Sequence, residues 1–240
     1  VDDSTPPTIV CPINITIECT DSTDPTNTGS ASATDNCDLV PSITYSDATI
    51  ASTVCPQEYT INRTWTATDD CGNSSTCLQV IIVDDSTPPV ITLCPANITI
   101  ECTESTAPAN TGNATATDNC DPAPSVTFND VTTASQICPQ EYTINRTWNA
   151  TDACGNSSTC TQIITIDDST PPVITLCPAN ITIECDESTD PMNTGLASAT
   201  DNCDPAPAVT YNDVTTASMT CPQEYTIDRT WTATDACGNS

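Results

Sequence analysis

Acidic and amide residues recur along this chain in an arrangement that could bind a metal ion. The hexapeptide Asp-Asp-Ser-Thr-Pro-Pro stands at residues 2–7, 84–89 and 167–172, and further Asp and Asn residues follow each copy at fixed distances. Such carboxylates would repel one another if packed together without a cation. Ca²⁺ takes about six to eight oxygen ligands from carboxylates, amides and carbonyls, so we expect a calcium site at each hexapeptide. The expected ligands are Asp2, Asp3, Asp35, Asp38, Asp69, Asn73, Asp84, Asp85, Asp118, Asp121, Asp152, Asn156, Asp167, Asp168, Asp201, Asp204, Asp235 and Asn239.

The alternative interpretation is that these acidic loops are solvated and only keep the protein soluble. A further carboxylate, at Glu18, Glu101 and Glu184, comes just before the second cysteine of each repeat. We expect it at the opposite pole of its repeat, where it could reach the next hexapeptide.

The hexapeptides mark the boundaries of an internal repeat. Proline fixes the backbone φ angle and disfavours helix in the residue before it, so each hexapeptide predicts an extended, anionic connector. Similarity at a fixed period is a better guide to domain number than length is. We therefore expect three domains, at residues 1–82, 83–165 and 166–240, the last one incomplete.

The cysteines have the spacing of a disulfide framework. Each complete repeat has six cysteines, and the chain has no histidine and no Cys-x-x-Cys pair, which argues against a zinc site. Disulfides persist in oxidising compartments, so we expect an extracellular protein, secreted or held at a cell surface. Each bridge typically stabilises a small domain by about 2–4 kcal/mol.

Short runs with period-2 alternation, and the absence of a helix-length run with a 3.6-residue period, predict an all-β chain. The number of runs suits a tandem array of immunoglobulin-like β-sandwiches with three disulfides per complete repeat. In the first repeat we expect strands at residues 8–11, 14–19, 30–34, 42–45, 59–68 and 76–83, and a weak one near 48–53.

The poles of such a sandwich suggest which cysteines meet. In the first repeat, Cys37 and Cys71 would lie in neighbouring loops, Cys11 would lie beside Cys77, and Cys19 would be left with Cys55 at the other pole. The expected bridges are Cys11–Cys77, Cys19–Cys55, Cys37–Cys71, Cys94–Cys160, Cys102–Cys138, Cys120–Cys154, Cys185–Cys221 and Cys203–Cys237, with Cys177 unpaired.

The charge balance excludes several kinds of partner. The chain has 32 acidic residues against three arginines and no lysine, a net charge of −29. Phosphate backbones and anionic membranes would be repelled, so we expect no nucleic-acid partner. No apolar run approaches the roughly 20 residues of a membrane-spanning helix, so we expect no membrane insertion in this segment.

Three short motifs recur at fixed separation in the repeats, with small variations. They are Thr-Pro-Pro…Cys-Pro…Asn-Ile-Thr-Ile, Ala-Thr-Asp-Asn-Cys and Thr-Ala-Thr-Asp-Asp-Cys-Gly-Asn. In these motifs the chain resembles the hyalin-repeat (HYR) family of immunoglobulin-like modules, especially the cysteine-rich versions strung in tandem in secreted bacterial surface proteins. The resemblance implies an extracellular adhesive or structural role without catalytic activity. The additional cysteines Cys19 and Cys55 depart from the simplest family pattern.

These observations predict a calcium-stiffened, disulfide-stapled segment of a stalk or fibre, whose partners are further copies of the same repeat. The alternative is a binding module whose loops recognise a surface glycan or protein. Paired carboxylates also serve glycosidases. Their recurrence in every repeat, the lack of histidine and lysine, and the scarcity of aromatic residues argue against an enzyme.

Each repeat has a single arginine, at Arg63, Arg146 or Arg229. Strand parity puts Arg63 on the same face as Ile61 and Trp65, so we expect its guanidinium against the indole and paired with a carboxylate. A ligand-binding arginine is the alternative.

Two further expectations concern modification and the end of the chain. The Asp-Ser-Thr of each hexapeptide resembles the short O-glycosylation pattern of Bacteroidetes-type bacteria, which would make the protein a glycoprotein modified at Ser4, Ser86 and Ser169. The third repeat lacks counterparts of residues 158–165, including its sixth cysteine. We expect either that the segment is a window of a longer repeat polypeptide, which we favour, or that a neighbouring subunit adds the missing strand.

Overall fold

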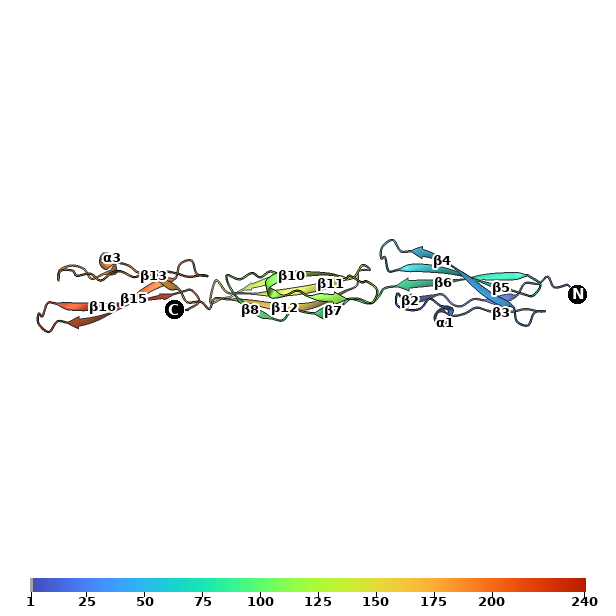
Figure 1. Ribbon diagram of the computed structural model, residues 1–240, viewed down its shortest axis with the longest axis horizontal. Helices are drawn as coiled ribbons and strands as arrows, with labels where there is room; N and C mark the ends of the chain where they lie inside the picture. Colours follow the sequence, from blue (N-terminus) through green and yellow to red (C-terminus); the bar gives the residue numbers. More distant parts are fainter. Residues whose placement is uncertain (1) are drawn as a thin grey trace. The chain divides into compact units, whose positions relative to one another are not determined.

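The computed structural model describes residues 2–240, and it confirms the expected fold class. The chain is all-β and consists of immunoglobulin-like β-sandwich repeats joined in tandem (Figure 1). It divides into two compact units. The first holds the residues up to Cys94 with residues 114–128 and 148–160, and the second holds residues 95–113, 129–147 and 161–240. The connector at residues 84–89 and the loops around it therefore belong to the first unit, and the connector at residues 167–172 belongs to the second.

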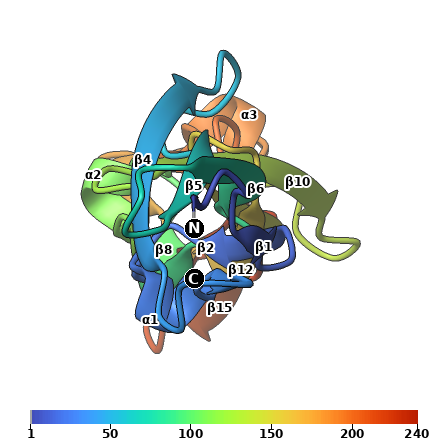
Figure 2. The ribbon, with the colours of Figure 1, turned by 90° about the vertical axis from the view of Figure 1, so that its right-hand side faces the viewer.

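The first repeat has two sheets. The smaller sheet pairs β1 with β3 in antiparallel register, and the larger has the strand order β2-β6-β5-β4. β2 runs parallel to β6, whereas β6, β5 and β4 are antiparallel. Figure 2 shows β4 at the edge of this sheet, beside β5. The elements are β1 (Thr8–Val10), β2 (Ile15–Glu18), α1 (Pro25–Thr28), β3 (Ser32–Thr34), β4 (Ser42–Ala51), β5 (Tyr59–Thr68) and β6 (Ser74–Asp84).

The second repeat has the same elements in the same order. Its smaller sheet pairs β7 with β9, and its larger sheet has the order β10-β11-β12-β8, with β8 parallel to β12. The elements are β7 (Val90–Leu93), β8 (Ile98–Glu101), α2 (Pro108–Thr111), β9 (Thr115–Thr117), β10 (Ser125–Ala134), β11 (Tyr142–Thr151) and β12 (Ser157–Asp167).

The third repeat keeps the smaller sheet and one hairpin of the larger sheet. Residues 181–184, the counterparts of β2 and β8, form no strand, because the described residues include no counterpart of β6 or β12 for them to pair with. No helix in the described part of the chain is long and apolar enough to cross a membrane. The elements are β13 (Val173–Leu176), α3 (Pro191–Thr194), β14 (Ser198–Thr200), β15 (Ala208–Ala217) and β16 (Tyr225–Thr234).

The apolar core of each complete repeat is small. Buried aliphatic side chains from the parallel strand pair and from the neighbouring long strand form it. Buried polar side chains fill much of the remaining interior, so hydrogen bonds and disulfides carry a large share of the stability. The aliphatic cluster consists of Ile17, Ile61, Ile81 and Val83 in the first repeat, and of Ile100, Ile144, Ile164 and Ile166 in the second.

Gln79 on β6 is a buried polar residue that holds separate segments together. Its side chain is 0% exposed, and its Nε2 donates hydrogen bonds to the carbonyls of Ile13 at 3.0 Å and Thr28 at 2.7 Å. The segment before β2 and the end of α1 are therefore fixed to the sheet. Gln162 makes the equivalent bonds in the second repeat.

Arg63 has the structural role expected from the sequence. Its Nε and Nη2 donate to the two carboxylate oxygens of Asp47 at 2.8 Å each, across the β4–β5 pair. The guanidinium carbon lies 4.4 Å from the ring centre of Tyr45 and 5.9 Å from that of Trp65, so the cross-strand tyrosine is the nearer aromatic partner. Nη1 also donates to Thr28 Oγ1 at 3.0 Å.

Two local expectations are corrected by the structure. The run at residues 42–45 and the weak run near 48–53 form one continuous strand, β4, because it pairs along its whole length with β5. The single-turn helix α1 was not expected, although Pro25 at its first turn and Gly29 just after it are a known helix signature. Gly29 has a φ of 94°, a conformation that glycine adopts readily.

Candidate metal centre at the repeat junctions

Asp85 is the central residue of the first junction, which we define as the connector at residues 84–89 with the loops that surround it. The side chain follows β6 and is 3% exposed. Neither of its carboxylate oxygens has a partner in good hydrogen-bond geometry. Its main-chain carbonyl accepts a hydrogen bond from Asn156 Nδ2 at 2.7 Å, which fixes the connector to the loop after β11.

Two loops of the second repeat place one aspartate each at this junction. Oδ1 of Asp118 accepts hydrogen bonds from the amides of Cys120 and Asp121, each at 2.8 Å. Oδ1 of Asp152 accepts from the amides of Cys154 and Asn156, at 2.9 and 2.8 Å. In both aspartates Oδ1 accepts hydrogen bonds from amides of its own loop, whereas Oδ2 is buried without a hydrogen-bond partner.

The three aspartates lie close enough to interact electrostatically. The pKa of Asp85 is raised to about 6, first by burial and then by the charges of Asp118 and Asp152, while the Thr87 amide opposes them. One carboxylate oxygen of Asp85, one of Asp152 and the sulfur of Cys154 lie within 4.8 Å of one another. All three arginines are paired elsewhere, with Asp47, Asp130 and Asp213, so no basic side chain neutralises this cluster.

Glu18 reaches the connector from the end of β2, as the sequence suggests. Its Oε1 accepts hydrogen bonds from Ser86 Oγ at 2.5 Å and Thr87 Oγ1 at 3.0 Å. The Ser86 bond is the main cause that lowers the pKa of Glu18, so this carboxylate stays ionised. An oxygen of Glu18, an oxygen of Asp85 and the sulfur of Cys120 lie within 4.8 Å of one another. The hydroxyl of Ser86, an expected glycosylation site, is thus hydrogen-bonded although the residue is exposed.

Two other expected ligands, Asp121 and Asp84, have partners outside this cluster. Asp121 is buried, and both its oxygens accept backbone hydrogen bonds, Oδ1 from Ala123 and Oδ2 from Ala153, each at 2.9 Å. It therefore clamps the two loops together. Asp84 shares a hydrogen bond with Glu58, whose pKa is raised by burial first and by Asp84 second. Successive side chains of an extended chain point to opposite sides, so Asp84 and Asp85 cannot both face the cluster.

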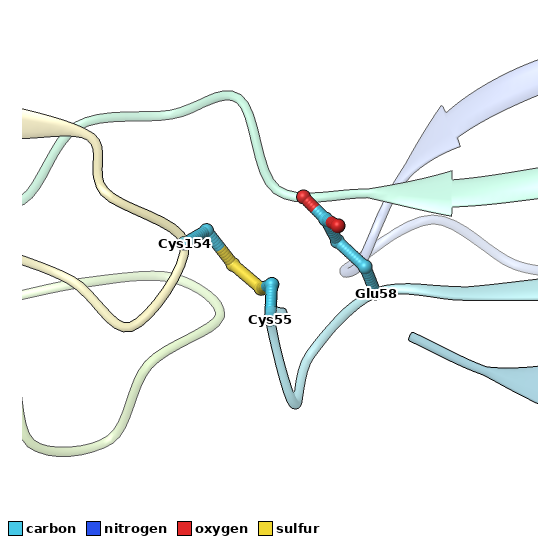
Figure 3. Close-up of side chains that lie close together, drawn as sticks. All are labelled: Cys55, Glu58 and Cys154. Atoms are coloured by element: carbon cyan, nitrogen blue, oxygen red, sulfur yellow. A yellow bond between two sulfur atoms is a disulfide. The ribbon is translucent and has the colours of Figure 1, made fainter. Parts of the chain in front are cut away.

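Glu58 is a residue that the sequence reasoning missed. Figure 3 shows its carboxylate beside the Cys55–Cys154 disulfide. The signal for it is that Cys-Pro-Gln-Glu-Tyr recurs at the fourth cysteine of each repeat.

The second junction, at residues 167–172 in the second unit, has the same arrangement with one difference: Oδ2 of Asp235, the counterpart of Asp152, accepts a hydrogen bond from Asn239 Nδ2 at 2.9 Å. Both oxygens of Asp168 and Oδ2 of Asp201 are buried without hydrogen-bond partners. Burial, and then the charges of Asp201 and Asp235, raise the pKa of Asp168. Glu101 accepts hydrogen bonds from the Ser169 and Thr170 hydroxyls, and the main-chain carbonyl of Asp168 accepts from Asn239 Nδ2 at 2.7 Å. Asp204 clamps its loops as Asp121 does, through the amides of Ala206 and Ala236, and Asp167 is the counterpart of Asp84.

The corresponding residues at the start of the first repeat are less enclosed. Asp3 is half-buried and Asp2 is exposed, while Oδ2 of Asp35 is buried without a partner. Asn73 Nδ2 donates to Asp69 Oδ2 at 2.8 Å and to the Asp3 carbonyl at 3.1 Å. Asp38 accepts from the amides of Val40 and Asp70, so it is another loop clamp. Among the described residues no glutamate reaches this group in the way that Glu18 reaches Asp85.

Most of the disulfides in the structure join other cysteines than the sequence predicts. Cys11–Cys77 and Cys94–Cys160 are present within their repeats. In place of the Cys19–Cys55, Cys120–Cys154, Cys102–Cys138 and Cys203–Cys237 bridges, the structure has Cys19–Cys120, Cys55–Cys154, Cys102–Cys203 and Cys138–Cys237. The physical reason is the short connector, which brings the far pole of one repeat against the near pole of the next. The expected Cys37–Cys71 and Cys185–Cys221 bridges are absent, and these four cysteines and Cys177 are free thiols.

Comparisons with known proteins give only a distant likeness. No protein-family model matches the chain. No curated protein matches it in sequence. Among solved structures, PcdhgB3 EC1-4 is 15% identical and has a TM-score of 0.27, with 73% of this chain and 54% of that one covered. Protocadherin gamma B7 extracellular cadherin domains 1–4 are 17% identical over 96% of this chain and 68% of that one, with a TM-score of 0.29.

The human desmocollin-1 ectodomain is 13% identical over 91% of this chain and 52% of that one, with a TM-score of 0.25. This chain thus spans about half the length of the PcdhgB3 and desmocollin-1 structures. At TM-scores this low the likeness carries no argument about function.

Proposed function

We propose that the chain is a segment of an extracellular structural or adhesive protein, made of three HYR-like modules at residues 1–82, 83–165 and 166–240, whose junctions are fixed by Ca²⁺ and disulfides. The single observation that carries the calcium part is the set of buried carboxylate oxygens of Asp85, Asp118 and Asp152 without hydrogen-bond partners. Buried charges without partners are strongly unfavourable, and a bound cation removes that penalty.

The chemistry of the donors favours Ca²⁺ over other metals. Asp85, Asp118, Asp152 and Glu18 supply hard carboxylate oxygens, and main-chain carbonyls can add more. Zinc prefers thiolate and imidazole ligands, but the nearby Cys19, Cys120, Cys55 and Cys154 are oxidised and the chain has no histidine. Mg²⁺ demands a strict octahedron and keeps most of its water, which suits an irregular, loop-built carboxylate cluster less well.

An extracellular location and a structural role have separate support. Six disulfides need an oxidising compartment to persist. Four of them link successive sequence repeats, which is of use to a protein that must keep its modules in register. The recurrence of the same cluster at Asp168 supports a role for every junction rather than a unique binding or catalytic site.

Calcium titration of the Asp85→Asn variant tests this proposal. Isothermal titration of the native chain should show two equivalent sites, at Asp85 and Asp168, and Asp85→Asn should lose one of them. Calcium at about 100 times its dissociation constant should stabilise the native protein by about 2.7 kcal/mol per site. Asp70→Asn removes an exposed carboxylate of the same charge and should keep both sites. The calcium proposal is wrong if the native chain shows no binding heat and its Tm is unchanged by EGTA.

A further inference from the structure

The Cys55–Cys154 disulfide, which links the first repeat to the second, has a carboxylate beside it. Figure 3 shows Glu58 next to this bridge, and the side chain comes from the loop between β4 and β5. One carboxylate oxygen of Glu58 and the two sulfurs lie within 4.8 Å of one another. The three arginines, the only basic side chains in the sequence, are all paired with aspartates. No basic side chain therefore balances the negative charge of Glu58 at the bridge.

The second unit has the same arrangement. There Glu141 is the counterpart of Glu58, and one of its carboxylate oxygens and the sulfurs of the Cys138–Cys237 bridge lie within 4.8 Å of one another. Glu101 lies beside the neighbouring bridge, where its Oε2 is 4.0 Å from the Cys203 sulfur. A carboxylate next to a bridge between repeats is thus a recurring feature of the described structure.

A glutamine lies against each of these bridges as well. Gln57 Oε1 is 3.5 Å from the Cys55 sulfur and 3.8 Å from the Cys154 sulfur. Gln140 Oε1 is 3.4 and 3.8 Å from the corresponding sulfurs of the second unit. Both glutamines come from the recurring Cys-Pro-Gln-Glu-Tyr sequence. This sequence therefore places two oxygen-bearing side chains, one of them charged, around each bridge.

Burial decides which sulfur of the bridge a reagent can reach. Cys55 is 1% exposed, whereas Cys154 is half-buried. A thiolate that reduces a disulfide attacks one sulfur and expels the other as a thiolate. Attack from solvent therefore falls on Cys154, and the expelled thiolate forms on buried Cys55, close to Glu58. The carboxylate repels the incoming anion and disfavours the new one, because like charges this close raise the energy of both.

From this juxtaposition we infer that Glu58 and Glu141 protect the Cys55–Cys154 and Cys138–Cys237 bridges from reduction by anionic thiols. The reagents concerned are small thiols that carry carboxylate groups, such as glutathione. The inference rests on the structural role proposed above, which needs the bridges between repeats to stay oxidised. It does not rest on calcium, since neither glutamate is among the proposed ligands.

The reduction that Glu58 opposes has two steps. The reagent thiolate bonds to the Cys154 sulfur, the S–S bond breaks, and its electron pair stays on Cys55, which takes a proton from water. A second reagent thiolate then attacks the reagent sulfur of the mixed disulfide and releases Cys154 as a thiolate. Two reagent thiols are thereby oxidised to one disulfide, and the protein bridge is reduced to two thiols. Glu58 acts on the first step, in which charge approaches and develops beside it.

The test compares Glu58→Gln with the native full chain in EGTA. Each protein is treated with glutathione or with cysteamine, whose amine is cationic, and alkylated cysteines are quantified over time by peptide mass spectrometry. Glu58 is half-buried, so at about pH 8 it is ionised although burial raises its pKa. Glu58→Gln should speed the reduction of Cys55–Cys154 by glutathione about fivefold, the effect of one unit charge at about 4 Å in water. The gain with cysteamine should be smaller, because its amine offsets the charge of its thiolate.

The chain supplies its own controls. Glu58→Gln should leave the reduction rate of Cys138–Cys237 unchanged, and Glu141→Gln should speed that bridge while leaving Cys55–Cys154 unchanged. The rate for Cys11–Cys77 should be native in both variants, which separates a lost charge from a loosened repeat. Salt at about 0.5 M should reduce the difference between native and variant rates, because it screens the repulsion.

Three results would overturn the inference. They are an unchanged rate for Cys55–Cys154 in Glu58→Gln, an equal gain with glutathione and with cysteamine, and a gain that extends to Cys11–Cys77. Calcium titration of Glu58→Gln keeps the two proposals apart. A chain that binds no calcium but has protected bridges would refute only the calcium proposal, and one that binds calcium but has unprotected bridges would refute only this inference.

Discussion

The indole Nε1 of Trp65 donates a hydrogen bond to Oε1 of Gln79 at 3.2 Å, in a site where the two side chains are 3% and 0% exposed. Trp65 lies on β5 and Gln79 on β6, so this bond crosses the central strand pair. With the bonds to the Ile13 and Thr28 carbonyls, the amide group of Gln79 joins four segments of the first repeat. A polar network in this position specifies one packing arrangement only while every member has its partner.

Gln79→Leu should therefore destabilise the first repeat strongly. The substitution removes three hydrogen bonds. It leaves the Thr28 carbonyl and the Trp65 indole N–H buried without partners, at about 1–3 kcal/mol each, and the partly buried Ile13 carbonyl without its side-chain partner. We expect a loss of at least about 3 kcal/mol in the free energy of unfolding, measured by urea denaturation of the native chain. Gln136→Leu makes the same change at an exposed position and should have almost no effect.

Arg63→Lys should weaken the β4–β5 pair. Lysine keeps the charge but cannot make the two parallel bonds to Asp47 together with the bond to Thr28, and each lost hydrogen bond to a charged group costs about 1.5–3 kcal/mol. We expect a lower Tm for the first repeat in calorimetry. Arg229→Lys should lower stability less, because the Arg229 side chain is 14% exposed whereas that of Arg63 is 2% exposed. Equal losses in the two variants would contradict the assigned role of burial.

Calcium-free protein should become less stable as the pH rises from about 4 to 6. The pKa of Asp85 in the folded protein is about 6, above its ordinary value of 3.8, so the folded state binds this proton more tightly than the unfolded chain does. The stabilisation from the proton is complete below about pH 4 and is lost as the pH rises through 6. In EGTA, Tm should therefore be higher at about pH 5 than at pH 7.5, and Asp85→Asn should reduce this difference. With calcium the order should reverse, because the metal binds the ionised carboxylates.

Peptide mapping under non-reducing conditions should recover Cys19 linked to Cys120 and Cys55 linked to Cys154. Cys19→Ala/Cys120→Ala should then leave Cys11–Cys77 intact, because the latter bridge lies within one repeat. Recovery of a peptide that joins Cys19 to Cys55 would contradict the junction geometry.

The sequence predicts the interior of a repeat better than its ends. The predicted strand at residues 59–68 is confirmed, because the alternating residues Ile61, Arg63 and Trp65 define one buried face. The prediction for β4 is only partly right, because it gives two short strands where the structure has one. The acidic cluster could be expected because Asp85, Asp118 and Asp152 recur together. The roles of Asp84 and Asp121 could not be predicted, because they depend on which way a side chain leaves the connector and on which loop amides it meets.

The disulfide pairing shows why the ends were harder to predict. In a closed sandwich, Cys19 would have only Cys55 near its own pole. The decisive partner, Cys120, is 101 residues away along the chain, and a six-residue connector brings it close. Periodicity in the sequence defines the repeat but does not say whether a bond closes it or crosses to the next one.

The Cys11–Cys77 bridge has a consequence for how the protein responds to a pulling force. The bridge joins a point near the entry of the chain into the first repeat to a point near its exit, 66 residues later. Tension along the polypeptide would pass through the sulfur atoms and bypass the intervening loop. The loop between the two cysteines has a contour length of about 220 Å, at roughly 3.4 Å per residue. The force would not extend this length even if the strands in the loop separated. Cys94–Cys160 shields a loop of the same length in the second repeat, so each complete repeat acts as a nearly inextensible link until its sulfur bridge is reduced.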